Sequence, residues 1–90
     1  QCTIWTPGAP LDQCLAQAGL WIVLPRPAVV HLGFDGWRDA SDRTTVECGL
    51  SLHGLRLEAA QLAGRRQVDF TWRDTREDCW HAASYSVVLA

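Results

Sequence analysis

The sequence predicts a small all-β fold, an antiparallel β-sandwich of the immunoglobulin-like kind stapled by disulfide bonds. Short stretches of alternating apolar and polar residues recur at intervals near ten residues, which is typical of a sandwich. Four cysteines in a chain of 90 residues favour a disulfide framework. One domain fits this length. So short a chain buries only about 60–65% of the surface that its unfolded form exposes, so its stability is marginal and disulfide bonds are expected to add to it.

Two strands are predicted in the first half of the chain, over residues 20–25 and 28–34. The first alternates apolar side chains between two faces, and the second is an almost continuous apolar run. A Pro-Arg-Pro sequence separates them, because proline has no N–H for the strand ladder. Residues 35–37 are a turn signal, and the polar residues 38–44 predict a loop.

Four further strands follow. They are predicted over residues 45–52, 55–59, 68–72 and 84–89. The alternation in the third of these places Trp72 in the core, in register with Phe70. Two segments have helical features. Leucines four residues apart and a C-cap position at Gly19 predict at most one helical turn over residues 11–19, whereas residues 57–64 are assigned to a strand and a turn.

The cysteines define the predicted staples. Cys2, Cys14, Cys48 and Cys79 contain no Cys-x-x-Cys pair, which argues against zinc-ribbon and thioredoxin sites. Of the three pairings we favour Cys2–Cys14, which closes a local loop, with Cys48–Cys79, which joins the middle of the chain to its C-terminal part. Each bond would contribute roughly 2–4 kcal/mol. Such bonds form in an oxidising compartment, so a secreted, extracellular domain is expected.

Charge and hydropathy argue against several partners. The net charge is −2, whereas a nucleic-acid-binding domain would present a basic face. No apolar run approaches the roughly 18 residues that span a bilayer, so neither nucleic acid nor a membrane is an expected partner. No metal or other cofactor is expected. A mixed metal site of Cys48, Cys79, His53 and His81 is the less favoured alternative to disulfides.

Five tryptophans are an unusual number for 90 residues. Trp37 and Trp80 each stand beside a turn or a polar loop, so one face of each indole can remain accessible. A pyranose ring presents a flat patch of C–H groups that packs on such a face, while its hydroxyl groups seek hydrogen-bond partners. These two tryptophans therefore predict a carbohydrate-binding surface, with core packing or protein contact as the alternative.

His31 and His81 are candidate polar partners for a sugar. His31 lies within a predicted strand, where a half-buried structural histidine is the alternative, and His81 directly follows Trp80. An enzyme is not expected. Glycoside hydrolysis needs two opposed carboxyl groups, one of them protonated, whereas most acidic residues here lie in loops beside arginines that keep them ionised.

The order of these features resembles the starch-binding carbohydrate-binding modules of family 25 and the related family 53, over roughly residues 19–90. The resemblance lies in "LWIVLPRPAVVHLGFDGW", "LRLEAAQLAGRRQVDFTWRD" and "WRDTREDCWHAASYSV". Members of these families are small β-sandwiches appended to amylases and other α-glucan-acting proteins. A histidine and two tryptophans contact glucose in them, which implies these roles for His31, Trp37 and Trp80.

The same resemblance assigns further residues. Asp74 matches an aspartate in the turn before the second tryptophan, and Tyr85 matches a structural tyrosine that opens the last strand. After Trp80, a His-Ala-Ala sequence stands where the family has an Asp-Asn-Asn run, and His81 is the candidate substitute. Residues 1–18 lie outside the pattern and are expected to form an N-terminal extension closed by the first disulfide.

The predicted function is non-catalytic binding of a starch-type α-1,4-glucan, such as a maltooligosaccharide. Trp37 and Trp80 would stack on glucose rings, and His31 would donate a hydrogen bond between them. The domain would be a monomer that targets a linked catalytic domain to its polysaccharide. A protein-interaction or structural β-sandwich domain of a secreted protein is the alternative, and another glycan such as a β-glucan is a third reading, since stacking alone does not select the linkage.

Overall fold

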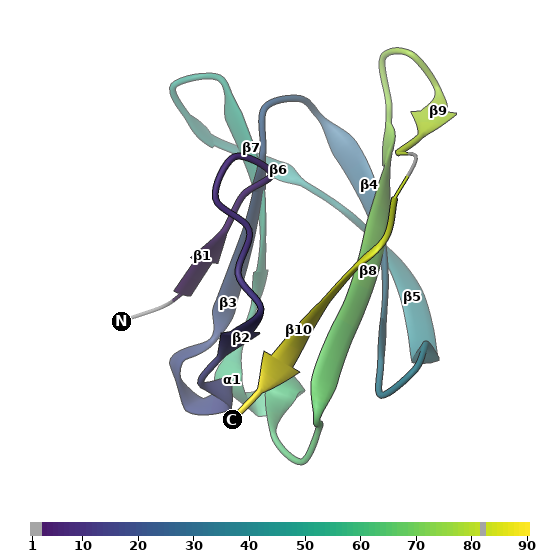
Figure 1. Ribbon diagram of the computed structural model, residues 1–90. Helices are drawn as coiled ribbons and strands as arrows, with labels where there is room; N and C mark the ends of the chain where they lie inside the picture. The colour runs from purple at the N-terminus through teal and green to yellow at the C-terminus, as the bar shows by residue number, and fades with distance from the viewer. Residues whose placement is uncertain (1–2, 82) are drawn as a thin grey trace.

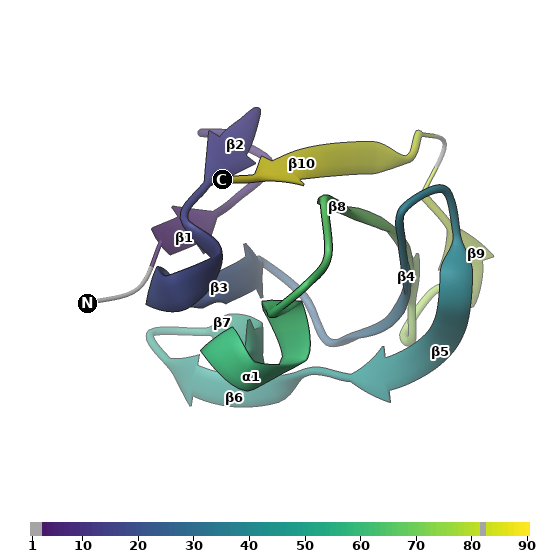
Figure 2. The ribbon, with the colours of Figure 1, turned by 90° about the horizontal axis from the view of Figure 1, so that it is seen from below.

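The computed structural model describes residues 3–81 and 83–90. Strands dominate, and they form two sheets that face each other across a core (Figures 1 and 2). The four-stranded sheet has, in spatial order, β1 (Thr3–Trp5), β3 (Leu20–Leu24), β7 (Leu52–Leu57) and β6 (Val46–Gly49). The six-stranded sheet has β2 (Gln13–Cys14), β10 (Tyr85–Leu89), β8 (Gln67–Asp74), β4 (Ala28–Phe34) and β5 (Arg38–Thr44), with β9 (Cys79–Trp80) also beside β8. The predicted all-β sandwich is confirmed.

The sheets are mixed, so the prediction of a purely antiparallel sandwich is wrong. β1 runs parallel to β3, and β2 runs parallel to β10. A parallel neighbour needs a crossover connection instead of a hairpin. The chain makes that crossover between β1 and β3 by passing through β2 in the other sheet. Residues 3–14, expected to lie outside the sandwich, therefore contribute a strand to each sheet.

Most predicted strands are confirmed. Besides the short strands β1, β2 and β9, the sequence prediction missed the seven-residue strand β5. β3, β4, β8 and β10 form where the apolar patterns predicted them. β5 was predicted as a loop because its residues are polar, and all but the half-buried Arg43 are exposed. It pairs with β4 alone at the edge of its sheet. A strand with neither face in the core has no hydrophobic alternation, and polar residues also discourage pairing with another chain.

Two short helical segments lie at the same end of the sandwich (Figure 2). The helical turn predicted over residues 11–19 is the 3₁₀ helix η1 (Ala16–Ala18), followed by Gly19 with a φ of 76°. The segment after β7, predicted as strand and turn, instead forms the helix α1 (Ala59–Leu62). Its first turn is closed by Gln61, whose side-chain oxygen accepts a hydrogen bond from the Glu58 N–H at 2.8 Å.

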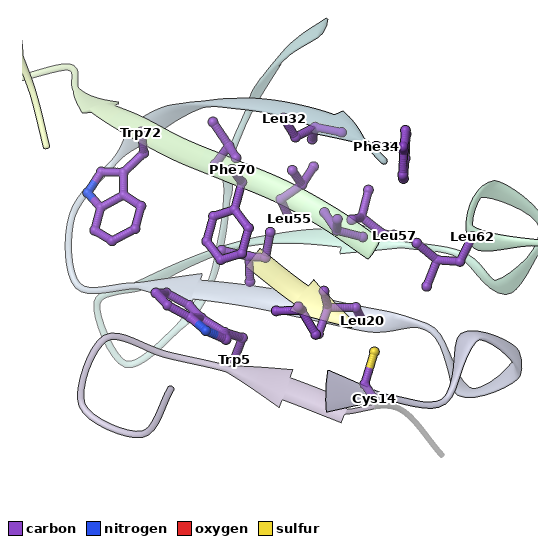
Figure 3. Packing of buried hydrophobic residues seen from close by; sticks show 14 of the residues in the cluster. Trp5, Cys14, Leu20, Leu32, Phe34, Leu55, Leu57, Leu62, Phe70 and Trp72 are labelled. Atoms are coloured by element: carbon purple, nitrogen blue, oxygen red, sulfur yellow. The ribbon is translucent and has the colours of Figure 1, made fainter. Parts of the chain in front are cut away.

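The core lies between the two sheets and is built around aromatic rings at one end (Figure 3). Trp5 of β1 is 1% exposed and packs edge-to-face on Phe70, with ring centroids 4.7 Å apart. Trp72 is 9% exposed and packs on Trp5, which confirms its predicted place in the core. Aliphatic side chains of β3, β4, β7, β8, β10 and α1 fill most of the remainder. Such aromatic packing contributes a large share of the buried area in a small domain.

The predicted disulfide framework is not found among the described residues. Cys14, Cys48 and Cys79, the three cysteines within the described residues, form no disulfide bond with one another. The Cys48–Cys79 bond is wrong because Cys48 lies on β6 of the four-stranded sheet, whereas Cys79 lies on β9 of the other sheet. Cys2 lies outside the described residues, so the Cys2–Cys14 pairing cannot be placed. Cys14 itself is buried, and this burial raises the pKa of its thiol.

The described residues also bear on two smaller predictions. They contain no cluster of three or more metal-ligating side chains, so the alternative site of Cys48, Cys79, His53 and His81 does not assemble. No helix within them is long and apolar enough to cross a membrane.

Candidate functional site

His31, Trp37 and Trp80 lie together on the outward face of the six-stranded sheet, although they come from distant parts of the sequence. The His31 ring lies 5.5 Å from the Trp37 ring, centroid to centroid, with the planes inclined by 19°. It lies 6.3 Å from the Trp80 ring with the planes inclined by 87°. We call these three residues the three-ring platform.

Strand alternation and register explain how the platform assembles. His31 is the middle residue of β4, and it faces outward because its neighbours Val30 and Leu32 are buried in the core. Across the sheet, His31 is paired with Thr71 of β8. Trp80 of β9 is paired with Arg73, two residues further along β8, and therefore shares the face of His31. Trp37 comes from the turn between β4 and β5, which bends back over β4.

All three rings remain accessible. Trp37 is 39% exposed and Trp80 is 53% exposed, and the His31 side chain is 39% exposed. Since the Trp37 plane is nearly parallel to His31 and the Trp80 plane is nearly perpendicular to it, the two indoles present their faces in different directions. The platform is therefore angled, with the imidazole at the corner.

Asp42 sets the hydrogen-bonding state of His31. It is the residue opposite His31 on β5, and its Oδ1 lies 2.6 Å from His31 Nδ1. Because an ionised carboxylate only accepts, Nδ1 carries the proton and donates. In the neutral ring, Nε2 is then an acceptor for a ligand hydroxyl, whereas the sequence predicts His31 as a donor. The Asp42 side chain is 59% exposed and can accept a further hydrogen bond.

Asp74 does not join the platform but holds the turn between β8 and β9. Its Oδ1 accepts hydrogen bonds from the backbone N–H of Arg76 at 2.8 Å and of Glu77 at 3.1 Å. Its Oδ2 accepts from Arg26 Nη1 at 3.2 Å. The Glu77 hydrogen bond, followed by those of Arg76 and Arg26, outweighs partial burial and lowers the pKa of the Asp74 carboxyl. Asp74 thus supports the hairpin that presents Trp80.

His81 also lies away from the platform, because it directly follows the last residue of β9, Trp80, and its side chain lies on the core side of the sheet, against Trp72. Its ring stacks on Trp72 with centroids 4.0 Å apart and planes inclined by 20°. Its Nε2 lies 3.0 Å from the hydroxyl oxygen of Tyr85. His81 and Asp74 line a separate pocket of 230 Å³ with the prolines of the β3–β4 connection. His81 is therefore a packing residue, although it is adjacent in sequence to the platform residue Trp80.

The sequence gives no signal for three polar residues beside the platform. Asp42 lies in a segment predicted as loop, and only the β4–β5 register places it opposite His31. Arg73 flanks Trp80, and its Nη1 donates to Asp78 Oδ1 at 2.6 Å. The resulting surface offers ring faces, one imidazole nitrogen, a guanidinium and exposed carboxylates, which are groups suited to binding a hydroxyl-rich, ring-shaped ligand.

Comparison with protein-family models, with curated proteins and with solved structures finds no match. The case for a function therefore comes from the residues and geometry of the three-ring platform.

Proposed function

We propose that this domain binds a starch-type α-1,4-glucan, without catalysis, on the three-ring platform. The observation that carries this proposal is the convergence of two exposed indoles at a steep angle, with an imidazole between them. Each indole offers a face for one glucose ring. The imidazole Nε2 and the Asp42 carboxylate would accept hydrogen bonds from hydroxyl groups at the corner.

The angle between the indoles favours a curved chain. Successive glucose units in an α-1,4-glucan turn relative to one another, so neighbouring rings present their C–H faces in different directions. A β-1,4-glucan is a flat ribbon that suits coplanar aromatic rings. The steep inclination of Trp80 to the His31 and Trp37 pair therefore supports an α-glucan as the ligand.

The remaining features of the proposal follow from the resemblance to family 25. The immunoglobulin-like strand arrangement, secretion, a monomeric state and attachment to a catalytic domain of amylase type belong to it. Affinity should be modest, with dissociation constants of roughly micromolar to millimolar, because stacking on two rings and a few solvent-exposed hydrogen bonds must offset the cost of association. Linkage to a second binding or catalytic unit would then raise the effective affinity.

Calorimetric titration with maltoheptaose and, in parallel, cellohexaose tests the proposal. We expect binding of maltoheptaose alone, weakened at least about tenfold in each of Trp37→Ala and Trp80→Ala, equal to about 1.4 kcal/mol. Trp21→Ala is the matched control, since this half-buried tryptophan lies on β3 in the other sheet, with the Arg56 guanidinium 5.9 Å from its ring centroid. Its affinity for maltoheptaose should be unchanged.

Two outcomes would contradict the proposal. Equal binding of both oligosaccharides would remove the α-glucan specificity and leave a general glycan surface. Absence of binding by a folded wild-type protein would refute glycan binding on this platform altogether.

Protein contact is the second candidate function, and one observation favours it. The outward side of the four-stranded sheet exposes apolar side chains, with Ile4 57%, Val46 62% and Leu52 40% exposed. Ile4 and Leu52 line a 330 Å³ pocket together with Thr6, Trp21, Val23 and Cys48. Exposed apolar patches often mark interaction surfaces. The simplest form of such a contact is self-association, which sedimentation velocity over a range of protein concentrations tests. Self-association that Leu52→Asp abolishes would support contact through this face. A monomer at every concentration would refute self-association.

A further inference from the structure

Asp69 is a buried carboxylate on the outward side of the sheet. Strand alternation places it on the same side of β8 as Thr71 and Arg73, where side chains meet solvent, yet it is only 3% exposed. A charged side chain this deeply buried needs hydrogen-bond partners, because leaving it without them is costly. Asp69 has four of them.

The two oxygens of Asp69 divide these partners between the sheet and the turn. Oδ1 accepts from the Ser86 hydroxyl at 2.6 Å and from Gln67 Nε2 at 2.7 Å, both groups of the sheet itself. Oδ2 accepts from the backbone N–H of Gly36 at 2.8 Å and of Trp37 at 3.1 Å. One oxygen thus anchors the carboxylate to β8 and β10, and the other holds the turn that carries Trp37.

That turn has a conformation that its residues do not favour by themselves. Asp35, Gly36 and Trp37 have φ values of 51°, 87° and 69°, three consecutive residues in the left-handed region. Glycine adopts this region readily and aspartate tolerates it, but a bulky residue such as tryptophan adopts it at a cost. Strained residues of this kind persist when surrounding contacts determine them, and they cluster at functional sites.

Gly33 brings the turn close to the sheet. It is paired with Asp69 across β4 and β8, and Asp69 is paired with Ser86 across β8 and β10. A Cβ atom on Gly33 would lie 2.8 Å from the Trp37 Cα, closer than a real Cβ contact allows. The Trp37 backbone therefore rests directly on β4 at Gly33, two residues from His31. We call Gly33, Asp69 and Ser86 the turn seat.

We propose that Asp69 is the positioning residue of the glucan site. It fixes the Trp37 turn on the turn seat, so that the indole already lies beside His31 before a ligand binds. This inference rests on the proposed function for its biological meaning, but the placement of Trp37 can be tested without a ligand. A preformed platform improves affinity because less conformational freedom is lost on binding.

The protonation state of Asp69 agrees with this role. Burial acts to raise the pKa of the carboxyl, but the hydrogen bonds from Ser86, Gly36, Trp37 and Gln67 together outweigh it, and the pKa lies below its ordinary value of 3.8. The carboxylate form, which accepts all four hydrogen bonds, is therefore present throughout the neutral and mildly acidic range.

The first test is Asp69→Asn, read out by the indole N–H signals of Trp37 and Trp80 in two-dimensional NMR without ligand. The amide nitrogen of asparagine cannot accept, so at least one donor of the turn or the sheet loses its partner. We expect the Trp37 signal to shift or broaden while the Trp80 signal stays in place. Asp39→Asn is the control, because it makes the same charge change at an exposed residue whose carboxylate pairs with Arg65.

Binding then tests whether Asp69 acts through Trp37. We expect Asp69→Asn to weaken maltoheptaose binding about tenfold, and to weaken it no further in a Trp37→Ala background. Additive losses in this double-mutant cycle would overturn the inference, because a general structural role would also damage the Trp80 half of the site. An unchanged Trp37 signal in Asp69→Asn would overturn it as well.

Two further variants keep the inference testable if Asp69→Asn does not fold. Gly33→Ala should displace the turn by steric contact and change the Trp37 signal, and Ser86→Ala, which removes one anchor of Oδ1, should do so to a lesser degree. If neither alters the Trp37 signal, the positioning role is refuted. A wild-type protein that binds no glucan, combined with a Trp37 signal that responds to Asp69, would support the positioning role and refute the glucan function alone.

Discussion

The two outward faces of the sandwich both expose large apolar side chains, but they differ in what holds those side chains. On the six-stranded sheet, exposed rings stand among ordered polar groups: Asp42 bonds His31, and Asp69 bonds the Trp37 turn. On the four-stranded sheet, the exposed apolar side chains Ile4, Val46 and Leu52 are aliphatic, and Ile4 and Leu52 line a common pocket with Trp21 and Val23. Exposure of apolar area is thus common to both faces. The six-stranded sheet differs because hydrogen bonds to polar groups fix the orientation of its exposed rings, and this is the face to which we assign a ligand.

A substitution in the core beneath both faces should cause the largest loss of stability. Trp5 is almost fully buried and contacts Phe70, Trp72 and Tyr85. Trp5→Ala should lower the free energy of unfolding by about 3–5 kcal/mol, since it removes a large side chain and leaves a cavity. Urea unfolding followed by circular dichroism measures this change. A loss below about 1 kcal/mol would show that β1 is not part of the cooperative core.

A substitution in the three-ring platform should weaken ligand binding while changing the stability of the domain only a little. Trp80→Ala removes a 53% exposed ring and should lower the free energy of unfolding by less than about 1 kcal/mol while weakening maltoheptaose binding at least about tenfold. Urea unfolding and calorimetry on the same preparation check both quantities. A loss of stability as large as that of Trp5→Ala would mean that Trp80 is a structural residue.

Acid should leave the Trp37 turn in place over the range in which ordinary aspartates begin to protonate. The pKa of Asp69 is lowered in the folded state, so its contribution to stability is present above the ordinary value of 3.8 and is lost only as pH falls through the lower folded value. In a His31→Ala background, which removes the titratable imidazole stacked on Trp37, the Trp37 indole signal should therefore be constant between about pH 7 and pH 4. A shift of that signal centred near pH 5 or above would contradict the assigned protonation state.

Asp42 should have a smaller effect on the platform. Asp42→Ala frees the His31 ring to rotate and to change its tautomer, because the 2.6 Å contact with Nδ1 is lost. An exposed pair of this kind contributes about 0.2–1 kcal/mol, so maltoheptaose affinity should fall by roughly two- to fivefold. Asp12→Ala, an exposed carboxylate beside β2, is the control for charge. Equal affinities of the wild-type protein and Asp42→Ala for maltoheptaose would show that the orientation of the His31 ring does not contribute to binding.

The apolar face should show the smallest effect. Leu50 is 95% exposed at the tip of the turn between β6 and β7, with a φ of 54°. Leu50→Asn should change the free energy of unfolding by no more than about 0.5 kcal/mol, in the stabilising direction, because asparagine tolerates the left-handed region better. Thermal unfolding checks this expectation. A clear destabilisation would indicate that Leu50 makes contacts that the exposed position does not suggest.

Much of the fold was predictable where a segment has one face in the core. β3, β4 and β8 alternate or run apolar because the sandwich interior selects their inward side chains. β5 and α1 were missed, since an edge strand with two polar faces carries no alternation and a four-residue helix depends on a local cap. The cysteine pairing failed for a different reason. Spacing along the chain does not say which sheet a strand enters, and Cys48 and Cys79 enter different ones.

The sequence by itself determined which apolar segments form strands, the core side of most of those strands and the accessible indoles at Trp37 and Trp80. The resemblance to family 25 placed His31 between these indoles. Only the tertiary structure decided that His81 and Asp74 lie elsewhere, and that Asp42 bonds His31 while Asp69 bonds the Trp37 backbone. The physical reason is that burial leaves a pattern in the local sequence. Strand register, sheet order and hydrogen bonds between distant residues depend on contacts that no single segment contains.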